Sequence, residues 1–264
     1  MTPILMLGAG RMGGALIEGW RAAGAFQAGE LIIREPHSNP TLEAAKAAGA
    51  LVNPADGELK RATTVLLAVK PQVWREAARE VVPHLAEDAV IVSIAAGVRA
   101  GDISQAFGGR AVARVMPTTA VAVGQGTASI YAADPEARAR AHALMAPVGA
   151  VVDLADEDLM HAATAVSGSA PAYLYAFVEA LEAAGAAAGL PQADAARLAR
   201  STIAGAATLM ARSGVEPAEL RRQVTSPGGT TQAALDVLLA ADGFPELLRR
   251  AVEAAAKRSE ELGG

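Results

Sequence analysis

Cysteine is absent from the 264 residues of this chain, so disulfide bridges, thiolate metal ligands and thiol nucleophiles are excluded. Aromatic residues make up only 3% of the sequence. Lysine occurs four times, as Lys46, Lys60, Lys70 and Lys257. Because lysine is so scarce, a lysine that falls inside a motif is easy to assess.

Positive charge is also in deficit, since 23 Lys and Arg face 28 Asp and Glu, for a net charge of −5. This balance offers no electrostatic footprint for nucleic acid or an anionic membrane. Gly, Pro and charged residues interrupt every apolar run before it reaches the length of a membrane span. The first residues lack the basic start and apolar core of a signal peptide, so we expect a cytoplasmic protein. The hydrophobic share of 52% predicts a globular chain.

Short β-branched apolar runs alternate with helical patterns in the first part of the chain. The helical patterns include residues 11–23, 41–48 and 72–82. The expected strands cover residues 4–7, 31–33, 65–69, 90–95, 111–115, 126–131 and 150–154. This alternation predicts an α/β fold, namely a Rossmann-like, doubly wound, mostly parallel sheet with helices on both faces.

From about Glu157 onward the strand signal disappears. Helices are expected around residues 174–181 and over residues 193–212, 230–241 and 245–262. We therefore expect a dinucleotide-binding domain over residues 1–155 and an all-helical domain over residues 156–264. Gly205, at the centre of one predicted helix, indicates close packing against a neighbour. With few large side chains, the helical domain is expected to bury one face against a second subunit.

Residues 8–13 read Gly-Ala-Gly-Arg-Met-Gly and match the dinucleotide-binding pattern G-x-G-x-x-G between a predicted strand and a predicted helix. The end of the second strand bears on the choice of coenzyme. Arg34 is suited to the 2′-phosphate of NADP, whereas Glu35 is suited to the free ribose of NAD or to solvent. Arg34 comes first and Ser38 adds a hydroxyl, so the sequence favours NADP and leaves NAD open.

Two later strand ends fall at the same predicted edge of the sheet. Lys70 precedes Pro71 where ligands bind in open α/β sheets, and its ammonium suits the nicotinamide ribose or the substrate. A solvated lysine at a strand end explains Lys70 equally well. The small residues 95–97 would let a nicotinamide lie against the backbone.

A second glycine-rich segment, residues 226–231, reads Ser-Pro-Gly-Gly-Thr-Thr and opens a predicted helix. We expect Ser226 to be the N-cap and Pro227 the first helical residue. Bare backbone N–H groups and the positive end of the helix dipole would then receive a small carboxylate. An ordinary capped helix explains the same residues.

The residues favour reduction of an imine over oxidation of an alcohol. Alcohol oxidation usually needs a general acid–base, yet none of the four histidines lies in a motif. A 3-hydroxyacid dehydrogenase would need a lysine after its substrate-binding glycine loop, and residues 167–173 contain none. A protonated C=N is already electrophilic, so its reduction depends more on positioning and electrostatics.

Six segments, residues 8–14, 68–72, 93–98, 114–117, 167–173 and 223–231, carry a family resemblance over nearly the whole chain. The chain resembles pyrroline-5-carboxylate reductase. The resemblance implies a Rossmann domain followed by a helical dimerisation domain, with NADP or NAD as cofactor and no metal. It implies reduction of 1-pyrroline-5-carboxylate to L-proline by a homodimer that can assemble further, for example into a decamer. The active site would lie between one subunit's cofactor and helices of its partner.

The motif and the resemblance together imply roles for individual residues. The cofactor-binding residues are expected to be Leu7, Gly8, Ala9, Gly10, Arg11, Met12, Gly13, Arg34, Ala68, Val69, Lys70, Pro71, Ile94, Ala95 and Ala96. The substrate-binding residues are expected to be Val224, Ser226, Gly229, Thr230 and Thr231. Thr231, placed near the ring nitrogen, and Lys70 are the expected catalytic residues.

Three positions depart from the family's usual pattern. Thr118 stands where Asn is typical, which leaves the hydrogen bonding beneath the nicotinamide open. Ala170 replaces a usual glycine, and Gln223 lies where members vary. The alternatives are a reductase of another cyclic imine or small keto acid, and a non-catalytic dinucleotide-sensing protein on the same fold.

Overall fold

The computed structural model describes residues 1–263, and internal contacts divide the chain into two compact units. The first unit contains Met1–Gly168 and the chain from Ala255 onward, and the second contains Ser169–Ala254. The boundary expected from the sequence, between residues 155 and 156, lies earlier in the chain than the division after Gly168. The segment that follows it packs with the first unit, where the Glu157 carboxylate accepts hydrogen bonds from the Ala100 amide and the Arg114 guanidinium.

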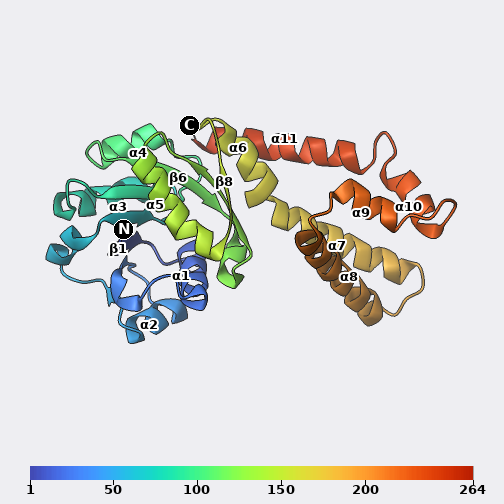
Figure 1. Cartoon of the computed structure of the whole chain (residues 1–264), viewed down its shortest axis with the longest axis horizontal. Coiled ribbons are helices and arrows are strands. Elements are labelled where there is room, and N and C mark those ends of the chain that lie inside the picture. The colour runs from blue at the N-terminus through green and yellow to red at the C-terminus, as the bar shows by residue number, and fades with distance from the viewer. Residues whose placement is uncertain (264) are drawn as a thin grey trace. The chain divides into compact units, whose positions relative to one another are not determined.

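The first unit is built on an eight-stranded sheet with the order β3-β2-β1-β4-β5-β6-β7-β8 (Figure 1). Only the β6–β7 pair is antiparallel among the described strands. The strands are β1 (Ile4–Leu7), β2 (Leu31–Arg34), β3 (Leu51–Val52), β4 (Thr64–Leu67), β5 (Val90–Ser93), β6 (Val112–Pro117), β7 (Gly126–Tyr131) and β8 (Gly149–Asp153). The prediction of a doubly wound, mostly parallel sheet is confirmed.

Helices cover both faces of this sheet (Figure 1). Successive residues of β1 point to opposite faces, because side chains alternate along a strand. Met6 belongs to a buried cluster that contains Trp20, whereas Leu5 belongs to a second cluster that contains Trp74. The helices are α1 (Arg11–Ala23), α2 (Pro40–Ala47), α3 (Trp74–Val81), α4 (Ala100–Ala106), α5 (Pro135–Met145) and α6 (Leu159–Ala163), followed by a π-helical turn over Thr164–Gly168.

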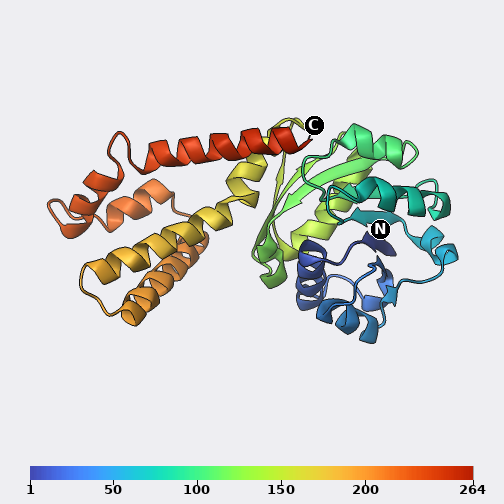
Figure 2. The same cartoon turned by 180° about the vertical axis from the view of Figure 1, so that it is seen from behind.

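The second unit is entirely helical in its described secondary structure. It contains α7 (Ala170–Ala187), α8 (Gln192–Ser213), α9 (Pro217–Gln223) and α10 (Thr230–Leu238), and α11 (Phe244–Gly263) begins in it. Helices α7 and α8 lie side by side, joined by a short turn in which Gly189 has φ +103° (Figure 2). Within residues 1–263, none of the helices is long and apolar enough to cross a membrane.

Candidate active site

The predicted cofactor-binding segments meet at one edge of the sheet. Leu7 is in register with Arg34 on one side and with Leu67 on the other, and Leu67 is in register with Ser93. Since neighbouring parallel strands end at the same edge, the segments that leave them start side by side. Backbone hydrogen bonds join them, from the Gly8 amide to the Arg34 carbonyl (2.8 Å), from Ala68 to Leu7 (2.8 Å) and from Ile94 to Leu67 (3.0 Å).

The glycine loop between β1 and α1 needs its glycines for two different reasons. Gly8 has φ +95°, and a Cβ there would lie 2.8 Å from the Ala68 carbonyl oxygen. A Cβ on Gly13 would lie 2.4 Å from the Gly8 carbonyl oxygen. A Cβ on Gly10 would meet no atom within 4 Å. Contacts within the protein therefore exclude a side chain at Gly8 and Gly13, whereas the backbone at Gly10 faces open space.

That open space lies at the N-terminus of α1. The first intrahelical hydrogen bond runs from the Gly14 amide to the Gly10 carbonyl at 2.7 Å, so the amides of Arg11 and Met12 precede it. Amide donors and the positive helix end favour a bound anion. The loop thus fits the pyrophosphate of a dinucleotide.

The end of β2 carries Arg34 and Glu35. The Arg34 guanidinium pairs with the Asp56 carboxylate. The Glu35 carboxylate turns back to the glycine loop, where it accepts hydrogen bonds from the amides of Ala9 (2.8 Å) and His37 (2.9 Å). The Ser38 hydroxyl donates to the Glu43 carboxylate at 2.7 Å. The Glu35 side chain therefore points toward the glycine loop, whereas the Arg34 side chain contacts Asp56.

The segments after β4 and β5 supply the remaining predicted cofactor residues. Ala68, Val69, Pro71 and Ile94 are half-buried, Ala95 is buried, and Lys70 and Ala96 are exposed. The Ala95 amide donates to the Ser93 hydroxyl at 3.2 Å, and this hydrogen bond stabilises the turn that follows β5. Lys70 thus presents its ammonium to solvent at this edge.

Thr118, at the position where the resembled family usually has Asn, forms hydrogen bonds between β6 and β7. It is buried, and its hydroxyl accepts a hydrogen bond from the Thr127 amide at 3.0 Å. Its own amide donates to the Thr127 carbonyl at 2.9 Å. Thr118 therefore closes the antiparallel β6–β7 pair. The other departure, Ala170, is the first residue of α7, where right-handed helical backbone accepts a methyl group.

In the second unit, the Ser226–Thr231 segment differs from the sequence-based expectation. Helix α10 begins at Thr230 with Gly229 as its N-cap, so neither Ser226 as cap nor Pro227 as first helical residue is correct. The Gly229 amide donates to the Ser226 carbonyl at 3.0 Å, and Gly228 has φ +68°. Pro followed by Gly at positive φ is the signature of a type II turn. Ser226 is therefore the first residue of this turn and not the N-cap of α10.

The start of α10 retains the anion-binding feature. The first bond back to the cap runs from the Ala233 amide to the Gly229 carbonyl at 3.1 Å. The amides of Thr230, Thr231 and Gln232 precede it, and both threonine side chains are exposed. Val224, the C-cap residue that follows α9, is 67% exposed. The helix therefore begins at Thr230, where the helix expected over residues 230–241 begins, and its free amides lie after Gly229 and not after Ser226.

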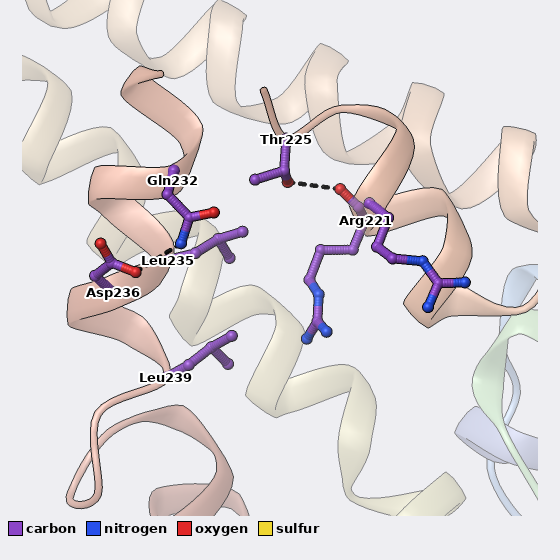
Figure 3. A pocket seen from close by; sticks show the side chains of 7 residues that line it. Arg221, Thr225, Gln232, Leu235, Asp236 and Leu239 are labelled. Atoms are coloured by element: carbon purple, nitrogen blue, oxygen red, sulfur yellow. Dashed lines mark hydrogen bonds between the residues drawn. The ribbon is translucent and has the colours of Figure 1, made fainter. Parts of the chain in front are cut away.

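A pocket of about 360 Å³ lies beside this segment, between α9 and α10 (Figure 3). Its lining consists of Arg221, Arg222, Thr225, Gln232, Leu235, Asp236 and Leu239. The Thr225 hydroxyl donates to the Arg221 carbonyl, and the Gln232 amide donates to the Asp236 carboxylate. None of the predicted substrate-binding residues lines the pocket. Its α10 residues follow helical spacing, the signal by which the sequence could have revealed them.

Comparisons with known proteins agree with this arrangement. Residues 157–262 match the sequence profile of the family described as pyrroline-5-carboxylate reductase dimerisation. Residues 3–97 match the profile of the family described as NADP oxidoreductase, coenzyme F420-dependent.

Individual relatives match over almost the whole chain. A pyrroline-5-carboxylate reductase of Pseudomonas aeruginosa is 39% identical over 99% of this chain and 97% of its own length. A solved pyrroline-5-carboxylate reductase of Coxiella burnetii superposes with a TM-score of 0.91 at 30% identity, covering 100% of this chain and 99% of that one. The Plasmodium falciparum enzyme, solved with NADP bound, has a TM-score of 0.84 at 26% identity and covers 100% of this chain and 98% of its own.

Proposed function

The chain belongs to the pyrroline-5-carboxylate reductase family, and we propose that it reduces 1-pyrroline-5-carboxylate to L-proline with a reduced nicotinamide dinucleotide. The observation that carries this proposal is the presence of two anion-binding helix starts in one chain. One is the glycine loop before α1, and the other is the start of α10 behind its Pro-Gly turn. The first suits a pyrophosphate and the second suits a carboxylate.

NADP(H) is a coenzyme of this reaction, and NAD(H) is the second candidate. When bound, the coenzyme supplies the hydride that reduces the imine carbon. Residues 7–13, Arg34, residues 68–71 and residues 94–96 would hold the dinucleotide, because they converge on one sheet edge. The required proton comes from solvent, since the four histidines lie outside the predicted site residues.

The substrate is held by Val224, Ser226, Gly229, Thr230 and Thr231. The amides at the start of α10 receive the carboxylate, and the Thr231 hydroxyl lies near the ring nitrogen. A protonated imine is electrophilic before any residue acts on it, so orientation is the main contribution of these residues. Lys70, exposed at the sheet edge, adds positive charge near the reacting groups.

A kinetic comparison tests the substrate. NADPH and NADH oxidation is measured with 1-pyrroline-5-carboxylate, a six-membered cyclic imine and pyruvate. We expect the highest kcat/KM with 1-pyrroline-5-carboxylate. A higher kcat/KM with either competitor would assign another substrate, and coenzyme binding without turnover of any of them would indicate a dinucleotide sensor.

Thr231→Ala tests the substrate site. Loss of one hydrogen bond should lower kcat/KM for 1-pyrroline-5-carboxylate about tenfold, while the Kd of the coenzyme stays unchanged. Thr231→Ser should restore most of the loss. Wild-type kinetics in Thr231→Ala would show that the substrate lies elsewhere.

The protein is a homodimer in this proposal. Helix α8 exposes Leu198, Leu209 and Met210, and a Cβ on Gly205 would meet no atom of the described residues 1–263 within 4 Å. The sequence predicts a helix packed closely against Gly205, and we propose that this helix belongs to a second subunit. The finer expectation is that dimers assemble further, for example into a decamer in the cytoplasm. Light scattering coupled to size exclusion measures the mass, and a monomeric mass would contradict the dimer.

A further inference from the structure

The position of Glu35 bears on which coenzyme the chain uses more efficiently. Its backbone amide donates to the Asn53 side chain at 3.0 Å, and the Asn53 side chain donates back to the Glu35 carbonyl at 2.9 Å. One carboxylate oxygen accepts from Ala9 and the other from His37. The half-buried Glu35 is therefore held at both its backbone and its carboxylate, directly beside the glycine loop.

We infer that Glu35 is the coenzyme-selecting residue, and that it makes NADH a better coenzyme than NADPH. This inference rests on the proposed function. In dinucleotide-binding βαβ units, an acidic residue at the end of the second strand hydrogen-bonds the adenosine ribose 2′-hydroxyl. Each carboxylate oxygen of Glu35 has a lone pair beyond the one its amide partner uses, so the group can still accept from ribose hydroxyls.

The same carboxylate disfavours NADPH. A 2′-phosphate ester carries close to two negative charges at neutral pH and cannot donate a hydrogen bond in that state. Placed where the ribose hydroxyl would be, it faces Glu35 at short range. Like charges at short range repel each other even in water. NADP(H) still binds through the rest of the site, but less tightly than NAD(H).

The positive charge of Arg34 is already paired with a carboxylate. Its guanidinium pairs with Asp56, whose carboxylate lies 3.6 Å from the His84 ring nitrogen on its other side. The Arg34 side chain is only 28% exposed. Only its Nη2 atom contacts Asp56, so a phosphate could still reach the guanidinium, but it would share that cation with the Asp56 carboxylate. The sequence favours NADP because of Arg34, whereas the contacts of Arg34 and Glu35 favour NAD.

Two adjacent variants and a charge-matched control separate the roles. Glu35→Gln removes the charge and keeps the shape, and Arg34→Gln removes the cation. Glu58→Gln removes the same charge at a half-exposed carboxylate that pairs with Arg61. Titration calorimetry with ADP-ribose and with 2′-phospho-ADP-ribose measures the Kd of each ligand without any turnover. Thermal unfolding checks that each variant is folded.

Wild-type protein should bind ADP-ribose more tightly than its 2′-phosphorylated form. Glu35→Gln should shift the ratio of the two Kd values about tenfold toward the phosphorylated ligand, and Glu58→Gln should leave it unchanged. Tighter wild-type binding of the phosphorylated ligand, or an unchanged ratio in Glu35→Gln, would overturn the inference. A collapse of phosphorylated-ligand binding in Arg34→Gln alone would transfer the selecting role to Arg34. These outcomes do not depend on whether 1-pyrroline-5-carboxylate is the substrate.

Discussion

The Glu157 carboxylate accepts a hydrogen bond from the Arg114 guanidinium at 2.8 Å, and the two side chains are 15% and 5% exposed. Arg114 lies in β6, and Glu157 lies in the segment that leads from β8 to α6. The same carboxylate accepts a hydrogen bond from the Ala100 amide at 2.7 Å, at the start of α4, and lies 3.8 Å from the Arg99 guanidinium. This pair therefore joins the last part of the sheet to the chain that leaves it.

Glu157→Gln should lower the free energy of unfolding by about 3 kcal/mol, because it leaves the buried Arg114 charge without a counter-charge. Urea unfolding followed by circular dichroism measures the change. Glu58→Gln, at an exposed ion pair with Arg61, should change it by less than about 1 kcal/mol. Equal effects of the two variants would contradict the role of the buried pair. The double variant Arg114→Met/Glu157→Leu should recover part of the loss.

Gly10→Ala should weaken dinucleotide binding at least about tenfold and leave the melting temperature within a degree or so of wild type. The backbone at Gly10 has φ −69°, which alanine adopts, and the added Cβ meets no protein atom. The methyl group would therefore obstruct only a bound pyrophosphate. Titration of the intrinsic fluorescence of NADH and NADPH gives the Kd.

Gly14→Ala is the matched control, because a Cβ there makes only ordinary contacts of 3.7 Å or more. In a helix interior this change should stabilise the protein by about 0.5–1 kcal/mol and leave the Kd unchanged. Wild-type affinity in Gly10→Ala would show that the pyrophosphate does not lie against Gly10.

Stability should depend on pH through the pair that links α7 to α8. The hydrogen bond from Arg200 holds the pKa of Glu182 below its ordinary value of 4.5. Since the folded-state pKa is the lower one, the stabilisation is present above the unfolded-state pKa and is lost as the pH falls through the folded-state pKa. Melting temperatures of wild type and Glu182→Gln should differ at pH 7, and the difference should shrink as the pH falls below 4.5. Glu179→Gln, an exposed carboxylate on the same helix, should track wild type throughout. A difference that stayed constant as the pH was lowered below 4.5 would assign the effect to packing.

Periodicity explains why much of the fold could be predicted. The strands Ile4–Leu7 and Gly126–Tyr131 and the helix Arg11–Ala23 agree with their predicted bounds to the residue. Each combines a clear period with a glycine or a polar residue at its end. The two-residue strand β3 is too short to give a period, so the sequence pattern does not predict it.

Two predicted strands extended too far for a physical reason. Residues 68–69 and 94–95 are as apolar as the strands before them, yet β4 ends at Leu67 and β5 ends at Ser93. Ala68 and Ile94 each make one more backbone hydrogen bond to the neighbouring strand, and the chain then leaves the ladder at the sheet edge where the cofactor-binding segments meet. Hydrophobicity along the chain does not reveal whether a residue is buried inside a sheet or beside a ligand.

The sequence by itself determined the fold class, the glycine loop and the family, because each can be recognised from short continuous segments of the chain. Only the tertiary structure decided what individual side chains do. It turned Glu35 toward Ala9, engaged Arg34 with Asp56 and used Thr118 to close the β6–β7 pair. Each of these contacts joins residues 9 to 26 positions apart. Local pattern specifies backbone geometry, but only the packed chain sets the partner of each polar group.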